Sequence, residues 1–230
     1  MTSRFFGLVP AAGSGSRFGV AGPKQYSPLA GKTVLFHAIE RLLAAPQVEV
    51  VFVVLAPADG EFRKHDWAGF GERIAPLYCG GATRRESVLN GLVAAASAVD
   101  PNDWILVHDA ARPCLGGAEL ARLIDGAGRD EVGGILAIPV SDTLKRSDDE
   151  RRIVETEPRD HLWQAQTPQM FRHGMLLKAL RDAVHVTDEA AAIEALGYRP
   201  KLVEGSTENL KITFASDLRV AEGILRERAA

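Results

Sequence analysis

The chain has little cysteine, no histidine cluster and no long apolar run. Its two cysteines among 230 residues, Cys79 and Cys114, form no C-x-x-C pair and follow no recognisable signal peptide, so we expect packing roles in a reducing, cytoplasmic setting. The six histidines lack the spacing of zinc ligands. Apolar runs stay well short of the roughly 18 residues that span a bilayer, so we expect no membrane partner.

Neither sign of charge is in large excess. Lys and Arg number 27 against 30 Asp and Glu, which gives a formal net charge of −3. Nucleic-acid-binding proteins usually carry a basic excess, so we expect no nucleic-acid partner and only local basic clusters. The length fits one large α/β domain or two small ones, and we expect a single domain over residues 1–230.

The most informative stretch is a short apolar strand, residues 5–9, that runs into a loop of small residues, Pro10-Ala11-Ala12-Gly13-Ser14-Gly15-Ser16-Arg17. Gly and Ala let the backbone approach a ligand closely, and exposed N–H groups in such a loop favour anions. Arg17 and, further on, Lys24 add positive charge. The pattern predicts a nucleotide site, and a plain strand-to-helix turn is the alternative.

Two better-known glycine loops do not fit this stretch. A Walker loop needs Lys-Ser or Lys-Thr after its last glycine, but Val20 and Ala21 follow Gly19. A dinucleotide fingerprint needs a third glycine three places after Gly15, where Phe18 stands. The sequence therefore disfavours both a P-loop and a dehydrogenase.

Downstream, buried strands alternate with helices, which predicts an α/β fold with a mostly parallel sheet. We expect strands at 48–55, 104–107 and 133–140, and helices at 34–44, 84–98 and 118–127. Residues 141–169 are polar and predict a β-arm that leaves the domain. Because an isolated hairpin is marginal in water, this arm should pack on a second subunit or on its own domain. Helices at 171–184, 187–196 and 216–228 and short strands at 201–204 and 209–213 should follow.

Ligands of open α/β sheets bind outside the carboxyl ends of the strands. Asp109 and Arg112 follow the strand at 104–107, so chemistry is expected there. His108, their neighbour, should point the other way and be structural. The small-residue loop, Lys24, the Gly80-Gly81 turn and Lys211 are expected at the same end.

Several motifs, in this order and spacing, resemble the 2-C-methyl-D-erythritol 4-phosphate cytidylyltransferase (IspD) family from about residue 7 to 225. They are Pro10-Ala-Ala-Gly, Gly15-x-Arg17, Pro23-Lys24-Gln25-Tyr26, Val107-His-Asp-Ala-Ala-Arg-Pro113, Asp142-Thr143, Gln166-Thr-Pro-Gln169, Thr187-Asp-Glu-Ala190 and Asn209-Leu-Lys211. The resemblance implies a three-layer nucleotidyltransferase fold. It also implies cytidylyl transfer from CTP to methylerythritol phosphate in non-mevalonate isoprenoid synthesis, with Mg²⁺ or another divalent cation, in a homodimer joined through the arm.

The resemblance also assigns roles to residues. Arg17, Lys24 and Lys211 would be catalytic, and Asp109 would serve the metal. The CTP site would comprise Pro10, Ala11, Ala12, Gly13, Ser14, Gly15, Arg17, Lys24, Gly80, Gly81, Ser87, Asp109, Ala110 and Lys211. Methylerythritol phosphate would meet Asp109, Arg112, Thr143, Arg159, Thr167 and Lys211. For Thr187-Asp188-Glu189 we expect only helix capping.

Simpler alternatives stand beside these roles. Asp109 and Ser87 could be structural turn and helix residues, Arg112 an internal ion-pair partner and Arg159 a solvated surface arginine. Ser16 and Ala82 depart from the family pattern at a triphosphate and a ribose contact. Ribitol 5-phosphate cytidylyltransferase is the nearest rival function, and a nucleotide-sensing module without activity is a more distant one.

Overall fold

A sheet with one reversed strand forms the centre of the protein. The computed structural model describes residues 3–13, 22–183 and 185–228. In these residues seven strands form one sheet in the order β11-β7-β10-β6-β1-β4-β5. Every neighbouring pair is parallel except those of β10, which runs antiparallel to β6 and β7. The strands are β1 (Phe5–Pro10), β4 (Val48–Val54), β5 (Ile74–Leu77), β6 (Trp104–Val107), β7 (Gly133–Pro139), β10 (Trp163–Arg172) and β11 (Lys201–Glu204).

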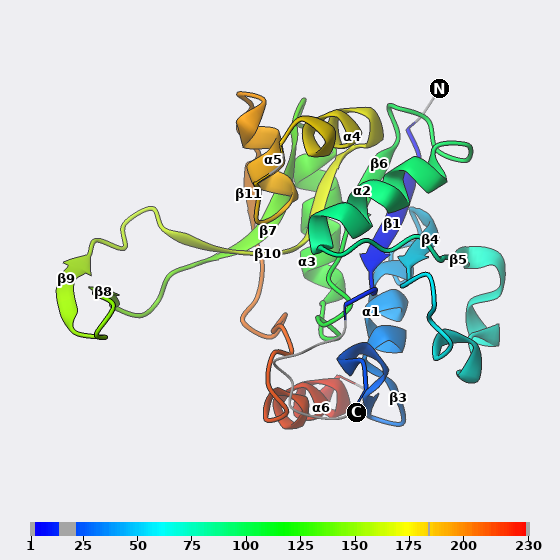
Figure 1. Cartoon of the computed structure of the whole chain (residues 1–230), viewed down its shortest axis with the longest axis horizontal. Coiled ribbons are helices and arrows are strands. Elements are labelled where there is room, and N and C mark those ends of the chain that lie inside the picture. The colour runs from blue at the N-terminus through cyan, green and yellow to red at the C-terminus, as the bar shows by residue number, and fades with distance from the viewer. Residues whose placement is uncertain (1–2, 14–21, 184, 229–230) are drawn as a thin grey trace.

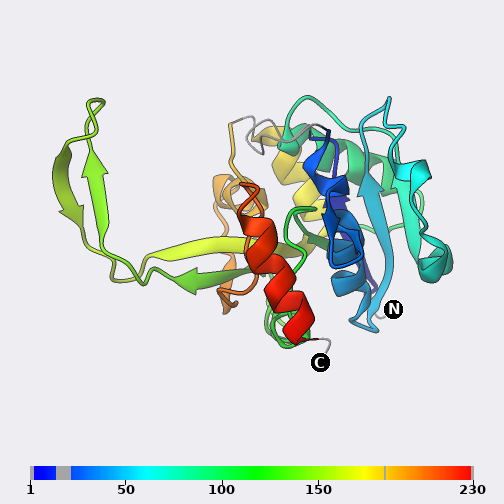
Figure 2. The same ribbon diagram turned by 90° about the horizontal axis from the view of Figure 1, so that it is seen from below.

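Helices cover both faces of the sheet, which confirms the predicted three layers (Figures 1 and 2). One face packs against α1 (Val34–Leu43) and α3 (Gly117–Ala127). The other packs against α2 (Arg84–Ala95), α4 (His173–Asp182) and α5 (Glu189–Ala195). The last helix, α6 (Asp217–Glu227), forms a smaller core of its own with Cys114 and Ile212.

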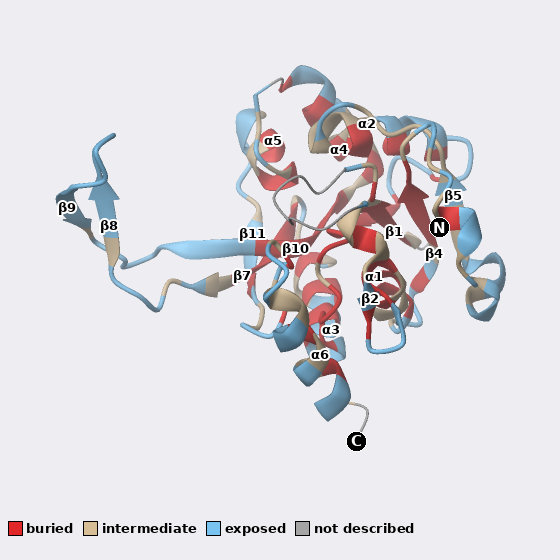
Figure 3. Cartoon of the chain, turned by 60° about the horizontal axis from the view of Figure 1, so that its bottom comes forward, coloured by how far each residue is buried: buried red, intermediate tan, exposed pale blue. Residues whose placement is uncertain are grey.

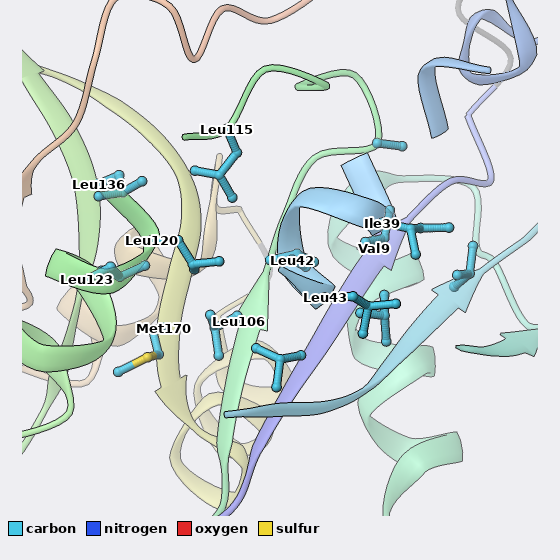
Figure 4. Packing of buried hydrophobic residues seen from close by; sticks show 14 of the residues in the cluster. Val9, Ile39, Leu42, Leu43, Leu106, Leu115, Leu120, Leu123, Leu136 and Met170 are labelled. Atoms are coloured by element: carbon cyan, nitrogen blue, oxygen red, sulfur yellow. The ribbon is translucent and has the colours of Figure 1, made fainter. Parts of the chain in front are cut away.

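The alternation of side chains along each strand supplies both cores. In β1, Leu8 faces the α2 side while Val9 faces the α1 side, and Ile105 and Leu106 divide in the same way in β6. Figure 4 shows Val9 and Leu106 packed with Ile39 and other residues of the α1 side. Side chains buried on both faces explain the nearly unbroken apolar runs of these strands.

The predicted arm projects from the body. Its hairpin consists of β8 (Leu144–Ser147) and β9 (Ile153–Glu157), which pair with each other alone and are almost wholly exposed (Figure 3). The prediction that the arm extends to residue 169 is wrong at its end. From Trp163 onward the chain is β10, which pairs with β7 from its start and lies between β7 and β6 of the central sheet at residues 169–172.

The polarity of β10 explains this error. Gln166, Thr167 and Gln169 are buried in the strand, and their side chains are hydrogen-bonded inside the protein. A central strand that buries polar side chains looks like a surface segment in sequence, because hydrophobic patterning marks only apolar burial.

Other differences concern element ends and short elements. The helix expected from 84 to 98 ends at Ala95, the one expected from 171 begins at His173, and residues 209–213 form no strand. β5 was not predicted. The remaining short elements are η1 (Lys24–Tyr26), β2 (Pro28–Leu29), β3 (Lys32–Thr33), η2 (Phe62–Lys64) and η3 (Ala68–Arg73).

Candidate functional site

A cleft of about 690 Å³ opens where β1 and β6 end. Residues 10–13 line it after β1, and residues 109–111 line it after β6, which places it at the carboxyl ends of two parallel strands as expected. Its described lining comprises Pro10, Ala11, Ala12, Gly13, Lys24, Gln25, Gly81, Ala82, Thr83, Arg84, Ser87, Asp109, Ala110, Ala111, Lys211 and Thr213. Of the predicted site residues, Ser14, Gly15 and Arg17 lie outside the described residues.

Two loops of small residues, 10–13 and the Gly80-Gly81 turn, pack closely against each other at one wall of the cleft. The N–H of Gly80 donates to the carbonyl of Leu55 at 2.8 Å, which holds the Gly80-Gly81 turn at the sheet edge. A Cβ atom on Gly80 would lie 2.3 Å from the Cβ of Ala12, so no larger residue fits where the loops meet. The side-chain amide of Gln25 donates to the carbonyl of Ala11 at 2.7 Å and fixes the first loop from the other side.

The turn before α2 is closed by its own side chains. Thr83 and Glu86 form a capping box at the helix start. The hydroxyl of Ser87 accepts the N–H of Gly81 at 3.1 Å and donates to the carbonyl of Thr83 at 3.0 Å. Ser87 therefore lines the cleft, and its hydroxyl is hydrogen-bonded within the turn.

Asp109 is the only carboxylate that lines the cleft among the described residues, and cations surround it. The ammonium of Lys211 lies 2.7 Å from Oδ2, and Nε of Arg84 donates to Oδ1 at 2.9 Å. Burial alone would raise the pKa of this carboxyl, but the neighbouring cations outweigh burial and hold its pKa well below the usual range. Asp109 is thus ionised, with one cationic side chain at each of its two oxygens.

The two lysines that line the cleft come from opposite ends of the chain. Lys24 stands at the start of η1, and Lys211 precedes α6. Nζ of Lys24 donates to the carbonyl of Ile212 at 2.9 Å, so the segment that carries one lysine also holds the other. The sequence predicted only that Lys24 and Lys211 lie at the same end of the sheet, and in the structure both line one cleft.

Arg112, Thr167 and His108 lie behind Asp109 and do not line the cleft. The hydroxyl of Thr167 accepts the N–H of Asp109 at 3.0 Å and lies 3.1 Å from Nδ1 of His108. Nη1 of Arg112 donates to the carbonyl of Asn209 at 2.5 Å, and its Nε lies 3.8 Å from Asp109. His108 is fully buried, its Nε2 lies 3.0 Å from the carbonyl of Arg112, and burial lowers its pKa to about 4.

Thr143 and Arg159 do not reach the cleft within this chain. Both are exposed at the base of the arm, and Arg159 donates to the carbonyl of Ser141. A role for either residue would therefore need a partner that brings it to a cleft.

Sequence reasoning missed Arg84 and Glu189. Arg84 begins α2 and Glu189 begins α5, and the two side chains form a double hydrogen bond in which Nη1 and Nη2 meet the carboxylate at 2.6 and 2.9 Å. Glu189 belongs to the Thr187-Asp188-Glu189 motif, for which only capping was expected. Asp188 does cap α5, by accepting the N–H of Ala191. The sequence signal that could have pointed to Arg84 is its position as the first residue of a helix that follows the Gly80-Gly81 turn.

No helix in the described part of the chain is long and apolar enough to cross a membrane. Within the same residues no three His, Cys, Asp or Glu side chains are grouped so that they alone could hold a metal ion.

The chain is similar to known proteins over nearly its whole length. Residues 6–227 match the family model described as IspD, 2-C-methyl-D-erythritol 4-phosphate cytidylyltransferase. Curated proteins of that name from Aromatoleum aromaticum and Nitrosospira multiformis are 56% and 58% identical, over 99% and 96% of this chain and 97% of each relative. A crystal structure of a 4-diphosphocytidyl-2C-methyl-D-erythritol synthase superposes with a TM-score of 0.87 at 41% identity, covering 98% of this chain and 99% of the other. The Francisella tularensis cytidylyltransferase gives 0.82 at 34%, over 96% and 100%.

Proposed function

Because the chain belongs to the 2-C-methyl-D-erythritol 4-phosphate cytidylyltransferase family, it transfers the cytidylyl group of CTP to methylerythritol phosphate in isoprenoid biosynthesis, and we propose that the cleft described above is where it does so. One observation carries the assignment of the site. Lys24 and Lys211, from opposite ends of the chain, line the same cleft, where Lys211 pairs with Asp109 and Lys24 donates to the carbonyl of Ile212.

The chemistry joins two anions and needs little proton transfer. A phosphate oxygen of methylerythritol phosphate attacks the α-phosphorus of CTP, a new P–O bond forms, and the bond to the bridging oxygen breaks as pyrophosphate leaves with its electron pair. The attacking phosphate monoester is largely ionised at neutral pH because its second pKa is about 6. The protein must therefore align the two anions and neutralise the charge that develops, rather than supply a general base.

We propose that the loops hold the nucleotide by their backbone. Residues 10–15 and the Gly80-Gly81 turn would receive the base, the ribose and the triphosphate, with Ser87 fixing the turn and Ala110 on the floor of the cleft. We propose that the close packing of Gly80 against Ala12 keeps the base site small, so that a pyrimidine would fit better than a purine. Arg17 and Lys24 would hold the triphosphate.

Lys211 and Asp109 would act at the reacting phosphorus. Lys211 is 41% exposed and can turn from Asp109 towards an arriving α-phosphate. We propose that Asp109 would hold Mg²⁺ or another divalent cation, with phosphate oxygens of CTP as further ligands. A single carboxylate suits this ion, because Mg²⁺ is usually held by one or two carboxylates and substrate phosphates. When bound, the ion would add further positive charge at the leaving pyrophosphate.

Methylerythritol phosphate would bind between this centre and the arm. We propose that Arg112 and Thr167 hold Asp109 in place from behind, while Thr143 and Arg159 reach the substrate from the arm of a second subunit. The exposed apolar side chains of β9 support a homodimer through the arm. We further propose that the enzyme is cytoplasmic and works on CTP and methylerythritol phosphate without nucleic-acid or membrane partners.

A pyrophosphate-release assay with CTP and Mg²⁺ tests the function directly. We expect turnover with methylerythritol phosphate and far slower turnover with ribitol 5-phosphate. Equal or reversed preference would contradict the substrate assignment. Pyrophosphate release that does not depend on either alcohol phosphate would contradict the reaction itself.

A further inference from the structure

The ion pair between Arg84 and Glu189 lies next to the catalytic centre, yet neither residue has a role in the reaction described so far. The side chain of Glu189 is 1% exposed, and both of its oxygens accept hydrogen bonds from Arg84. The N–H on Nε of the same guanidinium donates to Oδ1 of Asp109. One guanidinium therefore links two buried carboxylates, on the loop after β6 and at the start of α5.

Glu189 is held firmly by the central sheet. Gln169 of β10 accepts the N–H of Ala190 at 2.9 Å and donates to Asp188 at 2.9 Å. Asp188 in turn caps α5. The residues on both sides of Glu189 are thus fixed to a buried strand, so its carboxylate is a rigid support for the Arg84 guanidinium.

We propose that Arg84 and Glu189 form a positioning pair for Asp109, an inference that rests on the proposed roles of Asp109 and Lys211. Glu189 accepts from both terminal nitrogens of Arg84 and so fixes the plane of the guanidinium, which donates to Asp109 through Nε. Arg84 therefore holds Oδ1 alone and turns Oδ2 towards Lys211 and the cleft. Without Glu189 to fix its plane, the guanidinium could rotate, present two N–H groups to both oxygens of Asp109 and draw Oδ2 away from the cleft.

The order of charges supports this role over a simple structural ion pair. Glu189, Arg84, Asp109 and Lys211 form a row of alternating sign that ends at the cleft. Two carboxylates share Arg84, so its charge is not fully available to Asp109. The Asp109 carboxylate therefore keeps part of its negative charge for a cation on the cleft side, either Lys211 or a metal ion.

The test uses the full-length enzyme and compares Glu189→Gln and Arg84→Lys with the wild type. Glutamine keeps the shape of Glu189 but loses one acceptor and the charge, and lysine keeps the charge of Arg84 but cannot hold two carboxylates in a fixed fork. Arg85→Gln is the matched control. Arg85 stands in the same helical turn, but it donates to the carbonyls of Ala183 and Leu180, away from the cleft.

For each protein we would measure kcat and KM for CTP by pyrophosphate release, CTP affinity by calorimetry, and Tm. We expect kcat to fall about 10- to 100-fold in Glu189→Gln and Arg84→Lys, because small misplacements of catalytic groups cost up to about that factor. CTP affinity should stay within about 3-fold, because the loop contacts are intact. Arg85→Gln should lower Tm and leave kcat unchanged.

The outcomes separate this inference from the proposed function. If both variants keep wild-type kcat per folded protein, the pair is only structural and the inference is overturned. If the wild type itself releases no pyrophosphate with methylerythritol phosphate, the proposed function fails and the inference fails with it. If Glu189→Gln does not fold, Arg84→Lys, which keeps a buried charge beside Glu189, decides the question alone.

Discussion

Nζ of Lys24 donates a hydrogen bond to the backbone carbonyl of Ile212, 188 residues further along the chain. This bond ties η1 to the segment that carries Lys211. Replacing Lys24 with alanine should lower kcat by about 100- to 1,000-fold, the usual cost of losing one donor at a developing charge. Turnover and circular dichroism would show whether the loss is catalytic.

Lys64→Ala is the control for that change. Lys64 is 65% exposed and pairs with Glu61 on the surface, where an ion pair contributes little. Its activity should equal that of the wild type. Near-normal turnover of Lys24→Ala would show that the charge needed at the triphosphate lies elsewhere.

The contact between Gly80 and Ala12 predicts an effect on nucleotide binding. Alanine at position 80 would place a Cβ 2.3 Å from that of Ala12 and 2.8 Å from the carbonyl oxygen of Leu55. The loops must move apart, so Gly80→Ala should raise KM for CTP and cost about 1–3 kcal/mol of stability. Gly60→Ala, where an added Cβ meets nothing within 4 Å, should change neither. Equal KM values for the two variants would show that the contact between Gly80 and Ala12 does not shape the CTP site.

Asp103 predicts how stability depends on pH. Burial alone would raise its pKa, but N–H groups of Arg4 and Asp100 and the Arg4 guanidinium outweigh burial and hold the pKa below its usual range. The folded pKa lies below the unfolded value of roughly 3.9, so the carboxylate stabilises the fold above about pH 4. That stabilisation is lost as the pH falls through the folded pKa.

Asp103→Asn should therefore be less stable than the wild type at pH 7, and the difference should shrink below about pH 4. Denaturant unfolding at several pH values measures it. A difference that stayed constant down to pH 2.5 would mean that the charge of Asp103 is not what stabilises the fold.

The arm predicts self-association. Ile153 and Val154 of β9 are 68% and 62% exposed, which is unusual for large apolar side chains on a two-stranded hairpin. Ile153→Asp should weaken a dimer by about one to two orders of magnitude, since burial of such a side chain contributes ~1.5–3 kcal/mol. Val220→Asp, at a 57% exposed position on α6, is the control. Analytical ultracentrifugation would detect the change, and equal behaviour of both variants would remove the arm from the interface.

Hybrid dimers test whether the arm serves a neighbouring site. Arg159→Ala and Lys211→Ala proteins should each be weakly active. After subunit exchange, a mixture should regain activity, because some dimers would contain one intact site. Absence of recovery, with exchange verified by labelled subunits, would mean that each site is built within one chain.

Apolar periodicity predicted most of the fold from sequence because the cores of β1, β4 and β6 are nearly pure hydrocarbon. It failed at β10, where Gln166 and Gln169 are buried with their hydrogen bonds satisfied inside the protein. It also failed at residues 209–213, where polar and apolar residues alternate but no strand forms. Asn209 is buried because it donates a hydrogen bond to β10, and Ile212 is buried because it packs against α6.

The site shows a similar division. Loops and charges that follow strands 5–9 and 104–107 were predicted, because position after a parallel strand is readable from sequence. Glu189 was not, because its hydrogen-bond partner at the cleft is Arg84, 105 residues away in the chain. A pair of that kind becomes visible only when the helices that carry it are placed in space.

The reversed direction of β10 also has a use in engineering. Trp163 of β10 pairs with Pro139 of β7, so the chain leaves the sheet and returns to it at neighbouring positions. A short designed turn from Pro139 to Trp163 would replace the whole excursion and leave every strand of the central sheet in register. The projecting hairpin can thus be treated as a cassette, to be removed or exchanged with that of another member without rebuilding the body.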